Sequence, residues 1–193
     1  MCKCPIKVLT PKLKAGTYIC GADKEYLLVP CGHCEECNLK KQNDLVFRAY
    51  YEYLSCQHDK GFVLFQTLTY SEEHVPLAGG FRFFRKKDLQ KFLKRLRKKL
   101  CDAGYNVSDG QLRYLVSCEY GSKHYRPHYH FLFFVHFSID PAVFDSLVRE
   151  CWTNLDGKHR QRIGFVDRSN IEKRLVNSIY ILTYIFKQVN TIH

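Results

Sequence analysis

The sequence predicts an α+β fold with a central antiparallel sheet flanked by helices. Three apolar runs, at 61–70, 112–120 and 128–135, are rich in β-branched and aromatic residues and are typical of strands. Only a short connection separates the second run from the third, so we expect these two strands to pair antiparallel. Apolar residues at helical spacing between the runs predict helices that pack on the sheet.

The remaining elements are expected from spacing and from helix start and stop signals. Residues 1–37 are cysteine-rich and look irregular, so we expect an N-terminal arm followed by one domain at 38–193. Gly104 ends the most regular helix, and Asp140 with Pro141 begins the next one. In chain order we expect a helix at 38–56, a strand at 61–70, a helix at 88–103, strands at 112–120 and 128–135, a helix from 140, a strand at 162–168 and a helix at 170–187.

The composition indicates a folded, basic protein inside a cell. The 193 residues carry 30 Lys and Arg against 19 Asp and Glu, a formal charge of +11. This excess favours a polyanionic partner such as nucleic acid, although a merely basic protein has the same composition. No apolar run approaches the roughly 20 residues that span a bilayer, and the N-terminus has no secretory signal. We therefore expect no membrane contact, a cytoplasmic location and reduced thiols.

The helix at 88–103 combines an apolar stripe with an otherwise basic surface. Its charges nearly all share one sign, and like charges four residues apart repel each other on a helix. Contact with nucleic-acid phosphates would relieve this repulsion, so Arg95 and Lys98 are candidate DNA contacts. A solvated helix face is the alternative interpretation.

Two histidines stand where a strand built only for a core would need none. His128 and His130 share one face of the predicted strand, about 6–7 Å apart, which is close enough to bind one metal ion. Glu119 on the preceding strand can lie beside them if the hairpin pairs as expected. Two imidazoles and a carboxylate suit a divalent ion such as Mn²⁺ or Mg²⁺, a Lewis acid for a phosphodiester. The alternative is a pair of strand-end histidines bonded to the backbone.

Three cysteines in the N-terminal arm have metal-ligand spacing. Cys31, Cys34 and Cys37 form a C-x2-C-x2-C run, and a tetrahedral zinc site needs one more ligand, for which Cys2 and Cys4 are candidates. An iron–sulfur cluster uses the same ligands, and free buried thiols are the third interpretation. Four other cysteines lie in periodic apolar patterns and are expected in the core: Cys56, Cys101, Cys118 and Cys151.

Five segments together resemble one family. The segment "RPHYHFLFF" is similar to the His-hydrophobe-His motif of HUH endonucleases, which start rolling-circle replication and plasmid transfer. In order, "PCGHCEEC", "TLTYSEEH", "FLKRLRKKL", "CEYGSKHYRPHYHFLFF" and "YILTYIFK" resemble the replication initiation proteins of microviruses, single-stranded DNA bacteriophages of the gokushovirus type. The resemblance runs from Cys2 to about Lys187, whereas such initiators usually continue further. It implies the HUH endonuclease fold, a ferredoxin-like or RRM-like sandwich.

The resemblance also implies a tyrosine nucleophile. Tyr180 and Tyr184 lie four residues apart in "SIYILTYIFK", so a helix would place them on one side, one turn apart. In isolation both would be ordinary border residues of an amphipathic helix. As in the two-tyrosine HUH enzymes, attack on DNA would leave a 5′-phosphotyrosine link and a free 3′-OH. Lys187 would share their face and help hold the phosphate or the phenolate, or would be an exposed lysine.

The expected activity is that of a rolling-circle replication initiator acting on single-stranded DNA at an origin. "TLTY" matches the first motif of the family, so Thr67 and Thr69 are further expected DNA contacts. Host replication proteins are expected partners, and the cytoplasm of the bacterial host is the expected location.

The sequence leaves two rival functions open. The first is another HUH enzyme: a plasmid replication protein, a relaxase or a transposase. The second is a zinc-containing, RRM-like nucleic-acid-binding module, in which Tyr129, Phe131 and Phe133 would stack on bases.

Overall fold

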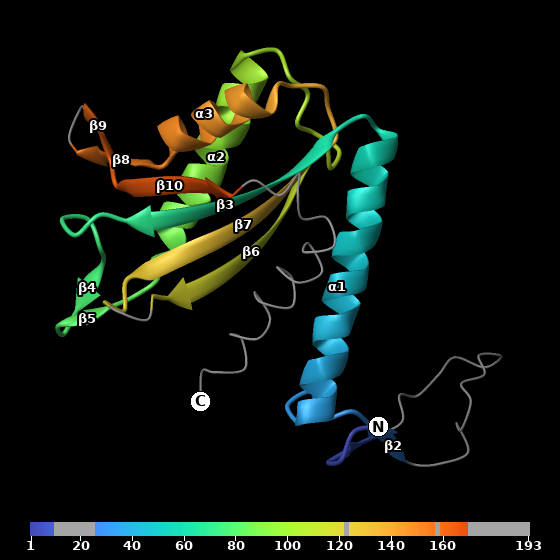
Figure 1. Cartoon of the computed structure of the whole chain (residues 1–193). Coiled ribbons are helices and arrows are strands. Elements are labelled where there is room, and N and C mark those ends of the chain that lie inside the picture. The colour runs from blue at the N-terminus through green and yellow to red at the C-terminus, as the bar shows by residue number, and fades with distance from the viewer. Residues whose placement is uncertain (10–25, 122–123, 157–158, 170–193) are drawn as a thin grey trace. The chain divides into compact units, whose positions relative to one another are not determined.

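The computed structural model of the chain describes residues 1–9, 26–121, 124–156 and 159–169 (Figure 1). The chain divides into two compact units, Met1–Phe47 and Arg48–His193. The longest helix, α1 (Glu35–His58), begins in the first unit and ends in the second. None of the helices in the described ranges is long and apolar enough to cross a membrane.

The N-terminal unit contains a short β-hairpin that the sequence analysis did not predict. Strand β1 (Ile6–Leu9) pairs antiparallel with β2 (Tyr26–Val29), with Ile6 opposite Val29. The expectation that residues 1–37 are irregular was therefore wrong, because each strand is only four residues long and gives little periodic signal. Helix α1 also starts three residues earlier than expected, with Glu35 and Glu36 in its first turn, where carboxylates are favourable.

The second unit is built on one antiparallel sheet. Its strands are β3 (Phe62–Tyr70), β6 (Leu112–Tyr120), β7 (Pro127–Val135) and β10 (Gly164–Ser169), in the spatial order β10-β3-β7-β6. Every neighbouring pair is antiparallel. The predicted α+β class, the pairing of the 112–120 and 128–135 runs, and the central place of the histidine strand are confirmed.

Helices α2 (Lys86–Asp102) and α3 (Pro141–Cys151) pack on the same face of this sheet (Figure 1). Phe92 of α2 contacts Phe131 of β7 with ring centroids 5.5 Å apart, and Phe144 of α3 contacts Phe133 at the same distance. Trp152 is fully buried beside them. This aromatic core fixes which face of β7 points inward, and it therefore also fixes which residues point to the other face.

Two further hairpins lie outside the sheet. Strands β4 (Leu77–Ala78) and β5 (Phe81–Arg82) enclose Gly79 and Gly80, whose φ angles of 56° and 82° are those of a tight turn that favours glycine. Strands β8 (Thr153–Asp156) and β9 (His159–Arg162) form the second hairpin. The expected helix at 170–187 lies outside the described residues.

The four cysteines expected in the core divide into two groups. Cys56 and Cys151 are buried, as predicted. Cys101 and Cys118 are exposed, so that prediction was wrong for them. Cys101 lies at the C-terminal end of α2 and Cys118 lies on the edge strand β6, and at such borders an apolar pattern does not ensure burial.

Asp140 caps helix α3, as its sequence predicts. Its carboxylate accepts a hydrogen bond from the backbone N–H of Ala142 at 2.6 Å, and Pro141 occupies the first turn. Because Asp140→Ala leaves that N–H without its partner, we expect a loss of about 1 kcal/mol in the free energy of unfolding. Urea denaturation measures this loss, with Ser138→Ala at a nearby exposed position as the control. Equal stability of the two variants would show that the cap does not stabilise α3.

Candidate functional site

The histidine pair lies on the face of the sheet opposite to α2 and α3. Side chains alternate along β7, so the burial of Tyr129 and Phe131 against the helices directs His128 and His130 to the other side. The two imidazole rings have centroids 6.2 Å apart. Both rings are partly buried.

The register of β7 with its two neighbours determines what the histidines touch. On β3, Thr67 lies opposite His130 and Thr69 lies opposite His128. On β6, Glu119 lies opposite His128. Each threonine hydroxyl is within hydrogen-bond distance of a ring Nδ1, at 2.9 Å for His130 and 2.8 Å for His128. The expectation that Glu119 lies beside the histidines is met, since its carboxylate is 2.9 Å from Nε2 of His130.

These contacts assign a tautomer to His130. Burial lowers the pKa of His130 although Glu119 opposes this, so the ring is neutral near pH 7. A carboxylate can only accept, so Nε2 of His130 carries the proton and donates it to Glu119. Nδ1 then accepts a hydrogen bond from the Thr67 hydroxyl, which can serve as donor or acceptor. Burial, reinforced by the neighbouring His130, also lowers the pKa of His128.

The surroundings of the pair leave room for its ring atoms. A Cβ at Gly121 would lie 2.6 Å from Nε2 of His128, so this ring position requires a residue without a side chain. Phe65 stacks on His130 with the ring planes 11° apart. The pair is therefore fixed from several sides, by hydroxyl groups from β3, a carboxylate from β6 and an aromatic ring from β3.

The donor set fits a divalent metal ion in kind, with one adjustment. Neutral imidazoles and a carboxylate are suitable ligands, and an outer partner on each Nδ1 is the usual way to orient a ligating histidine. Within the described ranges, only a group of four cysteines brings three or more candidate ligand atoms within 4.8 Å of one another. The side chains of Glu119, His128 and His130 would therefore have to draw closer together to share an ion.

Comparison with known proteins identifies the family. The model of the family of replication-associated proteins named for ORF2 matches residues 63–189, which is most of the chain. The chain belongs to this family. It is 38% identical over 116 residues to the replication-associated protein ORF2 of Spiroplasma virus 4, covering 58% of this chain and 34% of that protein.

Two other phage proteins give the same result. The replication-associated protein VP4 of Bdellovibrio phage phiMH2K is 34% identical over 137 residues, which is 65% of this chain and 41% of that protein. For the replication-associated protein ORF4 of Chlamydia phage 1, the values are 33% over 106 residues, 55% and 24%. The chain thus matches less than half the length of each relative, and no solved structure matches it. The resemblance to phage replication proteins is confirmed.

The other predicted site residues are distributed over different parts of the chain. Arg95 donates from Nε to the carbonyl oxygen of Cys151 at 3.1 Å and is bonded to that of Thr153, so its guanidinium group ties α2 to the end of α3. Lys98 is exposed and 3.3 Å from Asp102. Because α2 covers the face opposite to the histidines, a DNA contact at Lys98 stays a prediction about a separate surface. Tyr180, Tyr184 and Lys187 lie outside the described residues.

The base-stacking role considered for the β7 aromatics is excluded. Tyr129 is 1% exposed, and Phe131 and Phe133 are fully buried against the helices. Their rings form the protein core and are closed to a nucleic acid. The RRM-like module as drawn from the sequence was therefore wrong about which face carries aromatic groups, because alternation alone does not show which face the helices cover.

A pocket of about 630 Å³ near the histidines was missed from the sequence. Arg82 donates to the carbonyl oxygen of His124 at 2.6 Å, and the hydroxyl of Tyr120 donates to that of Arg82 at 3.2 Å, so the β4–β5 hairpin is joined to the β6–β7 connection. Phe81 and Tyr125 are 78% and 71% exposed beside it. The "GGFRFF" segment was the available signal, but by itself it predicts only a loop. The lining residues are Gly80, Phe81, Arg82, Tyr120, His124 and Tyr125.

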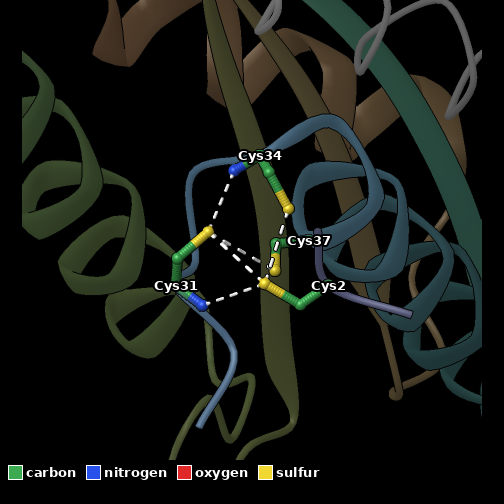
Figure 2. Close-up of side chains that lie close together, drawn as sticks. All are labelled: Cys2, Cys31, Cys34 and Cys37. Atoms are coloured by element: carbon green, nitrogen blue, oxygen red, sulfur yellow. Dashed lines mark hydrogen bonds between the residues drawn. The ribbon is translucent and has the colours of Figure 1, made fainter. Parts of the chain in front are cut away.

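Four cysteines of the N-terminal unit converge in Figure 2. The sulfur of Cys2 lies 3.6 Å from that of Cys31 and 3.7 Å from that of Cys34, and the sulfurs of Cys31 and Cys37 are 4.0 Å apart. Hydrogen bonds from the backbone N–H groups of His33 and Cys34 lower the pKa of Cys31 to about 6. The group could hold a metal ion such as zinc. Of the two candidates for the fourth position, Cys2 joins the group and Cys4 does not.

We expect the two histidines of β7 to remain neutral to lower pH than free histidine, whose pKa is near 6.5, because burial lowers both pKa values. Long-range ¹H–¹⁵N NMR spectra of the rings, recorded as a function of pH without metal, measure the pKa and the tautomer together. We expect His130 to be protonated at Nε2 when neutral. A midpoint above 6.5, or a proton on Nδ1 of His130, would contradict the assigned hydrogen bonds.

Proposed function

We propose that this chain carries the catalytic part of a rolling-circle replication initiator, a metal-dependent single-stranded DNA endonuclease and strand transferase. The observation that supports this most is the His128–His130 pair on a central strand, with Glu119 beside it, in a member of a replication-associated family. In this proposal residues 38–193 form the catalytic domain and residues 1–37 an N-terminal arm. The substrate is single-stranded DNA at an origin, in the cytoplasm of a bacterial host.

The order of elements supports the HUH endonuclease fold. The second unit follows the order β3, α2, β6, β7, α3, β10, which is the β-α-β-β-α-β arrangement of ferredoxin-like domains. The sheet order β10-β3-β7-β6 places the histidine strand in the interior of the sheet. The name "replication-associated" of the relatives favours an initiator over a relaxase or a transposase.

His128, His130 and Glu119 are the proposed ligands of Mn²⁺ or Mg²⁺. Each imidazole would present Nε2 to the ion, because Nδ1 is already opposite a threonine hydroxyl. For His130 this requires the proton to move from Nε2 to Nδ1, and the Thr67 hydroxyl can follow by changing from donor to acceptor. The bound ion would act as a Lewis acid that neutralises charge on the scissile phosphate.

Tyr180 and Tyr184 are the proposed nucleophiles. The phenol oxygen loses its proton and bonds to phosphorus, while the bond from phosphorus to the 3′-oxygen breaks and that oxygen takes up a proton. The products are a 5′-phosphotyrosine and a free 3′-OH that can prime synthesis. Because one phosphodiester is exchanged for another, the second tyrosine can repeat the transfer and release a closed strand. Lys187 is proposed to hold the phosphate or the phenolate.

The pocket beside the β6–β7 connection is the proposed contact for bases of the DNA strand. Exposed Phe81 and Tyr125 offer ring faces, and stacking on such rings stabilises single-stranded nucleic acid by about 1–3 kcal/mol per base. Arg82 adds positive charge, although it also pairs with Glu72. Tyr120 follows Glu119 directly in the chain, so a strand stacked here is close to the proposed ligands.

We expect His128→Ala and His130→Ala to weaken Mn²⁺ binding and nicking by at least about 100-fold, because removing an outer partner of a metal ligand already costs roughly 10–100-fold. Isothermal titration and cleavage of a labelled single-stranded oligonucleotide measure the two effects. His58→Ala, at an exposed histidine far along the chain in α1, is the control. Unchanged Mn²⁺ affinity in both site variants would refute the ligand assignment.

We expect Tyr180→Phe and Tyr184→Phe, made singly, to retain part of the cleavage or strand-transfer activity, and the double variant to lose covalent attachment to DNA completely. A phenylalanine keeps the ring but lacks the oxygen that forms the phosphotyrosine bond. Denaturing gels with labelled DNA show the adduct as a shifted band, and peptide mapping of that band identifies the residue. An adduct that persists in the double variant would show that another side chain attacks.

A further inference from the structure

We propose that Cys2, Cys31, Cys34 and Cys37 form a structural zinc centre that organises the N-terminal unit. This centre is separate from the proposed catalytic ion, because it consists of thiol groups only and lies on different elements of the chain. Its role is to fold the unit, since four protein ligands leave no coordination position for a substrate.

The backbone brings the four cysteines together in two pairs. The β1–β2 hairpin places Ile6 opposite Val29, and Cys2 and Cys31 lie just beyond these residues at the open end of the hairpin. Cys34 accepts the first α1 hydrogen bond, from the N–H of Asn38 at 2.9 Å, so Cys34 and Cys37 occupy the start of this helix. A helix N-terminus favours anions, which suits thiolate ligands.

The sulfur positions match a single tetrahedral ion. With metal–sulfur bonds of about 2.3 Å, the sulfurs of a tetrahedron are about 3.8 Å apart. The three closest pairs here are 3.6, 3.7 and 4.0 Å apart, and all four sulfurs lie within 4.8 Å of one another. An iron–sulfur cluster spreads its cysteine ligands further, because several ions and sulfides lie between them. The distances therefore favour one ion over a cluster.

Backbone amides complete the environment of the sulfurs. The N–H of Cys31 lies 3.3 Å from the sulfur of Cys2, and the N–H groups of His33 and Cys34 lie 3.4 and 3.3 Å from that of Cys31. Such N–H groups stabilise charge on a thiolate, as outer partners do for metal ligands in general. The ring of His33 is not a member of the group of ligands.

The N-terminal unit has little else to hold it together. Among its described residues, Cys37 is the only buried apolar side chain. The hairpin residues Ile6, Leu9 and Leu28 are at least half exposed, so the hairpin gains little from hydrophobic burial. Units this small usually need a metal or disulfides to fold, and all four cysteines are free thiols. A bound ion would supply the missing stabilisation.

The test is metal analysis of the full chain after removal of loosely bound ions. We expect about one zinc ion per chain, loss of that zinc in Cys34→Ser, and retention in Cys4→Ser, because Cys4 is exposed and outside the group. Replacement by Co²⁺ should give the intense visible absorption of a tetrahedral thiolate site. Amide hydrogen exchange in β1 and β2 should accelerate when zinc is removed.

The control against the other proposed site is His128→Ala, which should keep the zinc even where it loses Mn²⁺ binding. No stoichiometric metal in the wild type would overturn the proposal, and so would iron with inorganic sulfide in place of zinc. Equal metal content in Cys34→Ser and the wild type would overturn the ligand set. None of these results depends on nuclease activity.

Discussion

The register between β7 and its neighbours β3 and β6 is the constraint on which the site depends. Side chains alternate along a strand, so a shift by one residue would exchange the two faces of β7 and direct the histidines into the aromatic core. The contacts of Phe131 with Phe92 and of Phe133 with Phe144 make that shift costly, because these rings fill the space under α2 and α3. The core thus determines the position of groups that it does not touch.

The same register explains why the polar side chains of this face occur in rows. The row formed by Thr67 and His130 is followed by the row of Thr69, His128 and Glu119. The end of β3 is held in place by Trp152, whose indole N–H donates to the carbonyl oxygen of Thr69 at 3.1 Å. Gly164 of β10 allows close approach at the same point, since a Cβ there would lie 1.7 Å from that carbonyl oxygen.

Sequence patterns predicted the parts of this structure that depend on periodicity. The sheet strands, α2, the Asp140 cap of α3 and the position of Glu119 beside the histidines follow from spacing and pairing rules. Contacts between distant segments were not accessible in this way. The hydrogen bonds of Thr67 and Thr69 to the rings depend on which strand lies next to β7, and a linear sequence does not contain the order of strands. The pocket at Phe81 and Tyr125 was missed for the same reason.

The two threonine hydroxyls have a property that a carboxylate or an amide in the same place would lack. A carboxylate opposite Nδ1 would fix the proton there, and a carbonyl group would do the same, because both only accept. A hydroxyl group can donate to a bare nitrogen or accept from a protonated one. His130 can therefore donate from Nε2 to Glu119 in the arrangement seen here and still release that nitrogen as a ligand, without leaving Nδ1 unpaired in either state. In a partly buried site, an unpaired polar atom would cost about 1–3 kcal/mol, so this adaptability keeps both states accessible.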